Sequence, residues 1–278
     1  MINDMDFSII IVNYNSGRFL LDCVKSILNN LGGLSYEIIV VDNNSSDSSF
    51  SDCASIDDKR LILIQSGDNL GFSRANNIGA KHASGKFLHF LNPDTQISES
   101  LKDDYKRILI DFSTDVHCVY VNPLRDKDGT TYYGKSALPG TMNWIKYYLC
   151  RNKVNWYYMG ASVIIPTVDF NKIGKWNEKI FMYGEDADIF YRMNMYQLPI
   201  VELPSVIFHY GGGSSQKAFT NMAREILIQK SLRIYYKSNH LFWLDYWTFQ
   251  IIALSTFIKK PMRLWWQIKA IYLSFFGE

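Results

Sequence analysis

Cysteine is scarce in this sequence of 278 residues, and the four cysteines (Cys23, Cys53, Cys118 and Cys150) are far apart. They form no C-x-x-C pair, so the sequence suggests neither a zinc knuckle nor a disulfide framework. The net charge of +2 gives no reason to expect that the whole protein binds nucleic acid. The polar start at residues 1–4 and the short apolar run after it are unlike a signal peptide, so we expect a cytoplasmic, reducing location.

The sequence also lacks the usual glycine-rich phosphate loops. It contains no G-x-x-x-x-G-K-[ST] motif, and Gly67, Gly71 and Gly79 do not form G-x-G-x-x-G. A nucleotide bound by this chain would therefore be held by side chains at strand ends.

Apolar runs alternate with amphipathic segments over the first ~115 residues, and 47% of all residues are hydrophobic, enough for one sizeable core. The predicted strands are 7–12, 37–41, 61–65 and 87–91, and the predicted helices are 18–31, 73–83 and about 101–112. This alternation predicts an α/β fold with a mainly parallel sheet and helices on both faces. Residues 116–155 are mixed in character, and a polar loop with Gly129 and Gly134 is expected to reach over the sheet, while 162–166 is expected to form another strand.

Polar side chains follow several of these strands. Pro93 ends the run 87–91 and holds Asp94 on a stiff turn at the strand's carboxyl end, where open α/β sheets bind ligands. Asp42 follows the second strand, where it could bind a base or ribose edge or cap a helix. His209 follows the apolar run 206–208 and precedes three glycines, which allow a close approach of the backbone.

An acidic turn at Glu185, Asp186 and Asp188 places three carboxylates within four positions. Such a cluster repels itself unless a cation, a helix amino end or a substrate hydroxyl interacts with it. A helix beginning near Asp186 would put Asp188 and Arg192 at i and i+4, as an ion pair. The alternative is an acidic first turn of an ordinary helix.

Taken together, these motifs resemble the family 2 inverting glycosyltransferases, which have the GT-A nucleotide-diphospho-sugar transferase fold. The resemblance covers roughly residues 7–215 and follows one order along the chain. The motifs are Val12-Asn13-Tyr14-Asn15, Val40-Val41-Asp42-Asn43-Asn44-Ser45-Ser46, Asn69-Leu70-Gly71-Phe72 with Ala75-Asn76-Asn77, Leu91-Asn92-Pro93-Asp94, Gly160-Ala161, Phe181-Met182-Tyr183-Gly184-Glu185-Asp186-Ala187-Asp188 with Arg192, and His209.

The resemblance implies a role for each matching position. Asp42 would bind the base of the nucleotide, and Asp94 and His209 would hold a divalent metal, Mn²⁺ or Mg²⁺, on its diphosphate. Asp186 would be the catalytic base, paired with Glu185. The further donor-binding residues would be Asn13, Asn15, Asn69, Arg74, Asn76, Asn92 and Gly160. Asn92-Pro93-Asp94 departs from the family's Asp-x-Asp and leaves one carboxylate for the metal, as in the subgroup resembling rhamnosyl- and galactofuranosyltransferases.

This resemblance implies a metal-dependent inverting transferase that moves a sugar from a nucleotide-sugar donor to a lipid-linked saccharide acceptor in the synthesis of cell-surface polysaccharide such as O-antigen. The subgroup favours dTDP-L-rhamnose as the donor, with UDP-galactofuranose or another UDP-sugar next. A non-catalytic nucleotide- or carbohydrate-binding module of the same fold is the alternative. A nucleotide-sugar pyrophosphorylase would need a basic, glycine-rich loop after the first strand, where this chain has Asn13-Tyr14-Asn15.

The tail differs from the rest of the chain, so we expect a transferase domain at 1–225 and a helical, membrane-associating tail at 226–278. The tail interleaves Trp and Tyr with Lys and Arg, and its longest uncharged stretch is 13 residues, against ~20 for a spanning helix. Aromatic and basic side chains favour a lipid headgroup boundary, here the inner face of the cytoplasmic membrane. Alternatively, the aromatics pack on the transferase domain or form a homodimer interface.

Overall fold

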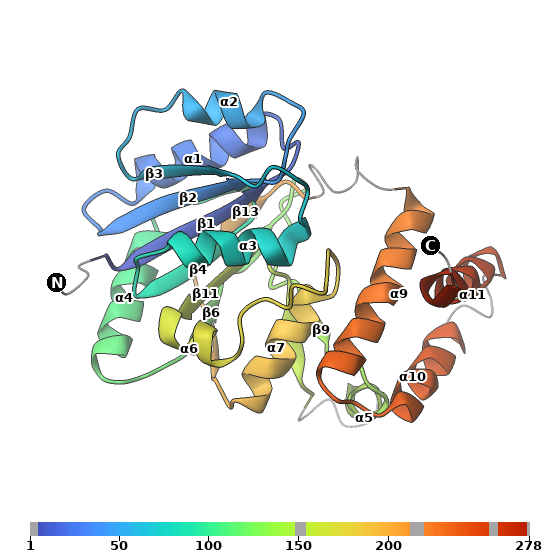
Figure 1. The fold of residues 1–278 in the computed structure, drawn as a ribbon. Helices are drawn as coiled ribbons and strands as arrows, with labels where there is room; N and C mark the ends of the chain where they lie inside the picture. The colour runs from blue at the N-terminus through green and yellow to red at the C-terminus, as the bar shows by residue number, and fades with distance from the viewer. Residues whose placement is uncertain (1–4, 148–153, 212–219, 256–260, 277–278) are drawn as a thin grey trace.

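The computed structural model describes residues 5–147, 154–211, 220–255 and 261–276. Its main sheet has seven strands: β1 (Phe7–Asn13), β2 (Tyr36–Asp42), β3 (Leu61–Gln65), β4 (Phe87–Leu91), β6 (Val119–Val121), β11 (Ser162–Pro166) and β12 (Ile200–Glu202). They lie in the order β12-β6-β11-β4-β1-β2-β3 (Figure 1). Strands β4, β1, β2 and β3 run parallel, and β11 runs antiparallel to both of its neighbours.

The four parallel strands confirm the prediction from the apolar runs. Every residue of β1, β2 and β4 is buried, as expected for strands covered on both faces. The register pairs Phe7 with Tyr36 and Asn13 with Asp42, so the last residues of β1 and β2 lie side by side. The polar groups that follow the strands therefore meet at one edge of the sheet.

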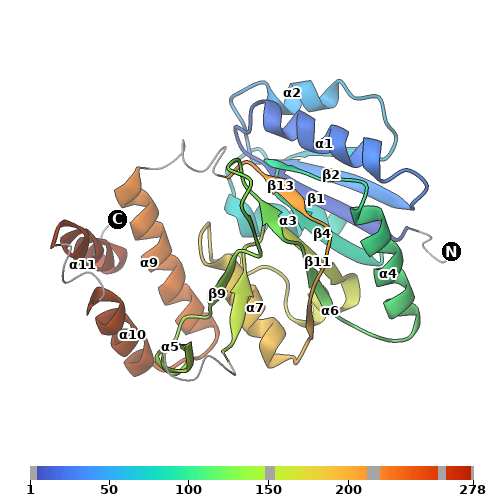
Figure 2. The ribbon, with the colours of Figure 1, turned by 180° about the vertical axis from the view of Figure 1, so that it is seen from behind.

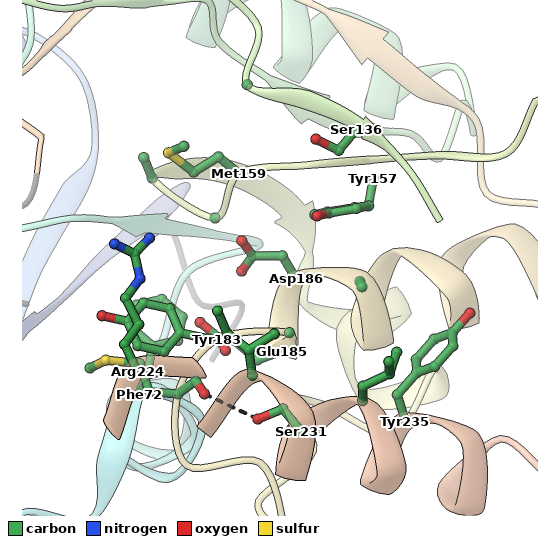
Figure 3. A pocket seen from close by; sticks show the side chains of 18 of the residues that line it. Phe72, Ser136, Tyr157, Met159, Tyr183, Glu185, Asp186, Arg224, Ser231 and Tyr235 are labelled. Carbon is green, nitrogen blue, oxygen red and sulfur yellow. Dashed lines mark hydrogen bonds between the residues drawn. The ribbon is translucent and has the colours of Figure 1, made fainter. Parts of the chain in front are cut away.

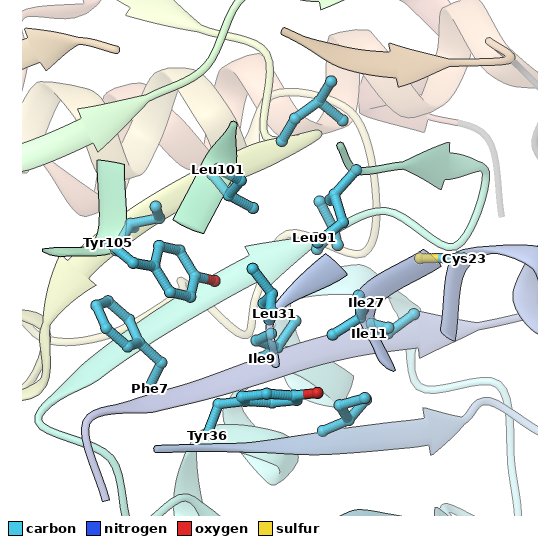
Figure 4. Packing of buried hydrophobic residues seen from close by; sticks show 14 of the residues in the cluster. Phe7, Ile9, Ile11, Cys23, Ile27, Leu31, Tyr36, Leu91, Leu101 and Tyr105 are labelled. Atoms are coloured by element: carbon cyan, nitrogen blue, oxygen red, sulfur yellow. The ribbon is translucent and has the colours of Figure 1, made fainter. Parts of the chain in front are cut away.

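Helices cover both faces of the sheet, because alternate side chains of a strand point to opposite sides. Ile9 and Ile11 face a core formed with α1 (Arg18–Asn30) and α4 (Leu101–Ser113) (Figure 4). Ile10 and Val12 face a second core, formed with α3 (Gly71–His82), α6 (Thr167–Lys172) and α7 (Glu185–Met195). A short helix, α2 (Ser49–Ala54), packs on α1.

Residues 116–155 contain regular structure besides the predicted polar loop with Gly129 and Gly134. Segment β6 is an inner strand of the main sheet, and further short strands of this region belong to two small sheets. A four-stranded sheet consists of β5 (Thr95–Gln96), β13 (Ile207–His209), β7 (Leu124–Arg125) and β8 (Thr131–Tyr132), and a two-stranded one of β9 (Lys135–Ala137) and β10 (Trp156–Tyr158). Pairing of β13 with β5 puts His209 opposite Thr95, next to the turn of Asp94.

The tail forms three helices, α9 (Asn221–Ser238), α10 (Trp243–Ser255) and α11 (Pro261–Phe276), which lie together beyond α7 in both ribbon views (Figures 1 and 2). The short helix α5 (Thr141–Ile145) packs against α10. The expected boundary between residues 225 and 226 lies inside α9. This helix is bonded to the acidic turn, because Ser231 Oγ donates to the Met182 carbonyl at 3.1 Å and Asn239 Nδ2 to Asp188 Oδ1 at 2.9 Å.

The aromatic side chains of the tail divide into two groups. Tyr235, Tyr236 and Tyr246 are buried in a small core of their own. Other large apolar side chains of α10 and α11 and of the turn before α10 are exposed, including Phe242, Leu244, Ile251, Met262, Trp265, Tyr272 and Phe276. None of the helices in the described ranges has the length and apolar character needed to cross a membrane.

Candidate active site

A cavity of about 790 Å³ lies at the edge of the sheet where the parallel strands end; we call it the strand-end cavity. Val12, Asn43 and Asn92 line it from the strand ends, and the acidic turn at the start of α7 lines another side. Helices α9, α10 and α11 supply the opposite wall, with the side chains Ile228, Gln229, Leu232, Tyr235, Phe249, Gln250, Leu254 and Gln267. The tail helices therefore form one wall of the cavity, and they also carry exposed apolar side chains.

The turn after β4 brings Asp94 against His209. Thr95 Oγ1 donates to the Asn92 carbonyl at 2.7 Å and closes the turn, while the Tyr210 amide donates to the Asp94 carbonyl at 2.9 Å. As a result, His209 Nε2 lies 3.4 Å from Asp94 Oδ1, and both side chains are buried at the cavity wall.

These two side chains fit a divalent cation that shares its ligands with a bound diphosphate. Ions such as Mg²⁺ bind through one or two carboxylates plus substrate phosphates, at about 2.1 Å per bond, so one ion could contact both atoms of a pair 3.4 Å apart. Within the described ranges, no hydrogen-bond partner occupies His209 Nδ1. No set of three His, Cys, Asp or Glu side chains in those ranges is placed to hold an ion without a ligand's help.

The acidic turn directs Asp186 into the cavity. Gly184 has a left-handed backbone (φ 100°), and α7 begins at the next residue. The Asp186 carboxylate accepts a hydrogen bond from the Gly160 backbone, and a Cβ atom added at Gly160 would lie 2.8 Å from Asp186 Oδ1. Glycine is therefore needed at 160 for the carboxylate to lie as close as it does. Figure 3 shows the carboxylate pointing toward the space beside Met159.

Burial changes the acidity of the adjacent pair. It raises the pKa of Asp186 to about 6, although the backbone hydrogen bonds favour the ionised form. The pKa of Glu185 is raised well above its ordinary value, first by burial and then by the neighbouring charge of Asp186. Glu185 Oε2 has no hydrogen-bond partner in the described part of the chain. Burial therefore favours the protonated form of Glu185, whereas Asp186, with a pKa of about 6, is mostly ionised at pH 7 and has a pKa that suits a general base.

The third acid of the turn has a structural role. Arg192 donates to Asp188 Oδ2 from Nε at 3.0 Å and from Nη2 at 2.7 Å, which confirms the predicted i, i+4 ion pair. Asp188 is fully buried, and the amides of Asn177 and Asn239 also donate to it. Its charge is thus fully paired.

Asp42 does not cap a helix, because α2 begins at Ser49 with Ser48 as its N-cap residue. Its Oδ1 accepts a hydrogen bond from Asn13 Nδ2 at 2.7 Å, and its Oδ2 accepts one from the Ser45 amide at 3.1 Å. Asp42 and Asn13 are both buried behind the strand-end cavity, and neither is among the residues that line it. The role of Asp42 toward a nucleotide base stays a prediction.

Some of the other residues predicted to bind the donor line the strand-end cavity, and the rest are outside its lining. Asn69, Asn92 and Gly160 line the strand-end cavity. By contrast, Asn15 Oδ1 accepts from the Ser46 amide at 2.7 Å, and Asn76 Nδ2 donates to the Phe72 carbonyl at 3.0 Å, both within the fold. Arg74 is exposed and donates to the Glu178 carbonyl at 3.3 Å. These three side chains are outside the cavity lining.

None of the sequence motifs marks the wall formed by the tail. Tyr183 lies within a matched motif, but Arg224, Gln229, Gln250 and Gln267 belong to no motif and are separated by up to 43 positions. Their amides connect the helices, because Gln250 Nε2 donates to Gln229 Oε1 and Gln267 Nε2 donates to Glu225 Oε2 at 2.8 Å. Only the packing of α9, α10 and α11 brings them together.

A parallel-rich sheet with a cavity at its carboxyl edge is the architecture of the nucleotide-binding α/β folds, among which is the GT-A fold. Residues 8–171 match the model of the family described as "Glycosyl transferase family 2". This match covers more than half of the chain, which therefore belongs to that family.

Curated relatives agree with this assignment. The chain is 31% identical over 205 residues to the "Low-salt glycan biosynthesis hexosyltransferase Agl10" of Haloferax volcanii, covering 67% of this chain and 61% of the relative. It is 24% identical over 192 residues to the "Glycosyltransferase GlyG" of Streptococcus pneumoniae, covering 65% and 61%. It is 30% identical over 129 residues to the "Minor teichoic acid biosynthesis protein GgaB" of Bacillus subtilis, covering 45% and 14%. The chain thus spans less than two thirds of the length of these relatives.

Solved structures share the fold. S. aureus TarS 1–349 in complex with UDP-GlcNAc aligns with a TM-score of 0.59 and 20% identity, covering 83% of this chain and 65% of that one. The crystal structure of S. aureus TarS 1–349 aligns with a TM-score of 0.53 and 18% identity, covering 84% and 72%. These similarities confirm the predicted GT-A architecture.

Proposed function

We propose that this protein transfers a glycosyl group from a nucleoside diphosphate sugar to a hydroxyl of a saccharide acceptor, with inversion at the anomeric carbon. The observation that supports this most is that the Asp186 carboxylate and the Asp94–His209 pair line one cavity. A single displacement at the anomeric carbon requires a base for the acceptor hydroxyl, and it requires ligands for a metal ion on the diphosphate that leaves.

Asp94 and His209 would hold a divalent ion, Mn²⁺ or Mg²⁺, which neutralises charge on the departing diphosphate. Asp186 accepts the proton of the acceptor hydroxyl as the new glycosidic bond forms. Gly160 positions Asp186 through its backbone hydrogen bond and by having no side chain there. Burial of Glu185 favours its protonated form, which limits a second negative charge beside the base. No general acid is needed, because a diphosphate leaves without being protonated.

Two classes of donor have support. The variant Asn92-Pro93-Asp94 resembles transferases that use dTDP-L-rhamnose or UDP-galactofuranose. The solved complex of TarS holds UDP-GlcNAc, which favours a UDP-sugar. We propose dTDP-L-rhamnose as the first donor to test and UDP-sugars as the second.

For the acceptor we propose a lipid-linked saccharide at the inner face of the cytoplasmic membrane. The exposed apolar side chains of α10 and α11, among them Trp265 and Tyr272, support this, because aromatic side chains favour a headgroup boundary. Lys269 lies over the Trp265 ring at 4.9 Å and adds a positive charge on the same helix. Relatives named for glycan and teichoic acid biosynthesis are consistent with a cell-surface polymer as the product.

The test is a donor screen with released nucleoside diphosphate as the readout. The protein, with Mn²⁺ and a membrane extract as the source of acceptor, is incubated with dTDP-L-rhamnose, UDP-galactofuranose and UDP-GlcNAc. We expect release from one donor and at least 100-fold less from Asp186→Asn. Binding of UDP or dTDP without release from any donor would instead support the non-catalytic module.

A further inference from the structure

The charge of the strand-end cavity is uneven. Four carboxylic side chains line it, Asp94, Asp126, Glu185 and Asp186. Among the described lining residues, Arg224 is the only Lys or Arg. A diphosphate entering a cavity whose charged side chains are mainly acidic needs positive charge from the protein as well as from a metal ion. Arg224 is the side chain in the described wall that can supply it.

The guanidinium of Arg224 lies over the ring of Tyr183, with Cζ 5.1 Å from the ring centroid. In Figure 3 the Arg224 side chain rises beside Tyr183 toward Met159, and the Asp186 carboxylate points into the same space. Within the described ranges, the guanidinium makes no ion pair or hydrogen bond with any of the four acids. An arginine stacked by its face keeps its N–H groups free to donate to a ligand.

Tyr183 is held in place for this contact. Its backbone is left-handed, with φ 64°, a conformation that is uncommon for a residue other than glycine and that costs roughly 1–3 kcal/mol. The preceding carbonyl, that of Met182, accepts the hydrogen bond from Ser231 Oγ of α9, the helix that carries Arg224. The turn and the helix are therefore fixed to each other, and the ring is a rigid support for the guanidinium.

A solvated surface arginine is the simpler explanation, but two observations oppose it. Arg224 lines a cavity, and it stacks on a ring whose strained backbone is bonded to the same helix. We propose that Arg224, held on Tyr183, is a phosphate-binding site of the strand-end cavity that takes one phosphate group of a diphosphate. This inference rests on the proposed function, which supplies two sources of that group: the nucleotide donor and the lipid diphosphate of an acceptor.

Binding measurements on the full chain distinguish the two sources. The probes are UDP and dTDP with Mn²⁺ for the donor, and farnesyl diphosphate for a lipid diphosphate, with uridine, thymidine and farnesol as partners that lack phosphate. Each is titrated by calorimetry into wild type, Arg224→Gln, Arg224→Lys and Arg107→Gln. Arg107 is an exposed arginine of α4 outside the strand-end cavity, so its variant is the matched control.

We expect Arg224→Gln to weaken one diphosphate by about 10- to 100-fold, the effect of losing charge-assisted hydrogen bonds. Arg224→Lys should recover part of the affinity, because it keeps the charge and loses the fork of donors. Weaker UDP or dTDP binding assigns the site to the donor, and weaker farnesyl diphosphate binding assigns it to the acceptor. The probes without phosphate and the Arg107→Gln protein should bind as before.

Diphosphate binding by Arg224→Gln within twofold of wild type would overturn the proposal, and so would a wild type that binds none of the diphosphates. Failure of the proposed function gives a different pattern. A protein that releases no nucleotide from any donor, yet loses diphosphate affinity on Arg224→Gln, would refute glycosyl transfer and retain the phosphate site.

Discussion

The three acids at the start of α7 occupy three different environments, and amide substitution should affect the stability of each variant differently. Asp186 lines the cavity with a raised pKa, Glu185 is buried without a partner for Oε2, and Asp188 is buried in its ion pair with Arg192. We expect Asp186→Asn to stabilise the fold, Glu185→Gln to leave it nearly unchanged, and Asp188→Asn to destabilise it.

The size of the Asp186 effect follows from its pKa, which rises from 3.8 to about 6 on folding. The folded protein binds this proton more tightly, so the stabilising contribution of the proton is complete below pH 3.8 and is lost as the pH rises through about 6. A shift of about 2 units corresponds to about 3 kcal/mol at pH 8. Asparagine does not ionise, so Asp186→Asn should gain up to that amount at pH 8, about 1 kcal/mol at pH 4.5, and almost nothing below about pH 3.

The two neighbouring variants are matched controls on the same helix. Burial favours the protonated form of Glu185, and glutamine has the same shape, so the free energy of unfolding should change little. Asp188→Asn removes the charge that faces Arg192 and leaves a mostly buried guanidinium unpaired, which costs about 3–5 kcal/mol.

Urea unfolding at pH 8 and pH 4.5, with transfer activity at pH 8, tests all three variants. Asp186→Asn should raise the unfolding midpoint about three times as much at pH 8 as at pH 4.5, keep donor binding, and lose 10²- to 10⁴-fold in turnover. The wild-type rate should fall as the pH drops below about 6, because the base becomes protonated. If the Asp186→Asn variant were no more stable than wild type at pH 8, the carboxylate would be well solvated. A raised pKa would then no longer support Asp186 as the base.

Three further substitutions test other parts of the site. Gly160→Ala should lower turnover at least tenfold with little loss of stability, because the added Cβ would lie 2.8 Å from Asp186 Oδ1 and push the carboxylate away. Unchanged kinetics would contradict this packing. Asp94→Ala should abolish the part of the activity that EDTA removes and Mn²⁺ restores, whereas full wild-type activity in EDTA would exclude the metal role. Trp265→Glu should reduce binding to anionic lipid vesicles in a sedimentation assay, with Ile110→Glu, an exposed apolar position on α4, as the control that binds like wild type.

The sequence predicted the parts of the fold that apolar runs encode. Strands β1, β2 and β4 are buried on both faces, so nearly every residue in them is apolar, and the run ends where the buried strand ends. For the same reason, the polar groups after those strands could be assigned to one edge. The ion pair between Asp188 and Arg192 was also predictable, because the two residues are four positions apart on one helix.

Contacts between distant segments were not predictable. Strand β6 has three residues, too few for a periodic pattern, and it is held by pairing with β11 and β12. The turn at Gly71 is fixed by Phe181, whose carbonyl accepts from the Phe72 amide at 2.8 Å and would clash with a Cβ atom at Gly71. Such pairs depend on chain topology, so a residue list read in order does not reveal them.

The tail illustrates why variants that test the site must be chosen from the structure. Truncation before Leu241 would seem to separate membrane binding from catalysis, since it removes α10 and α11. However, Phe249, Gln250 and Gln267 of these helices line the strand-end cavity, and Gln250 is bonded to Gln229 of α9. Activity lost on truncation would therefore follow from an opened cavity whether or not the protein binds lipid. A substitution on the outer face, which leaves the cavity wall unchanged, is the change that separates the two roles.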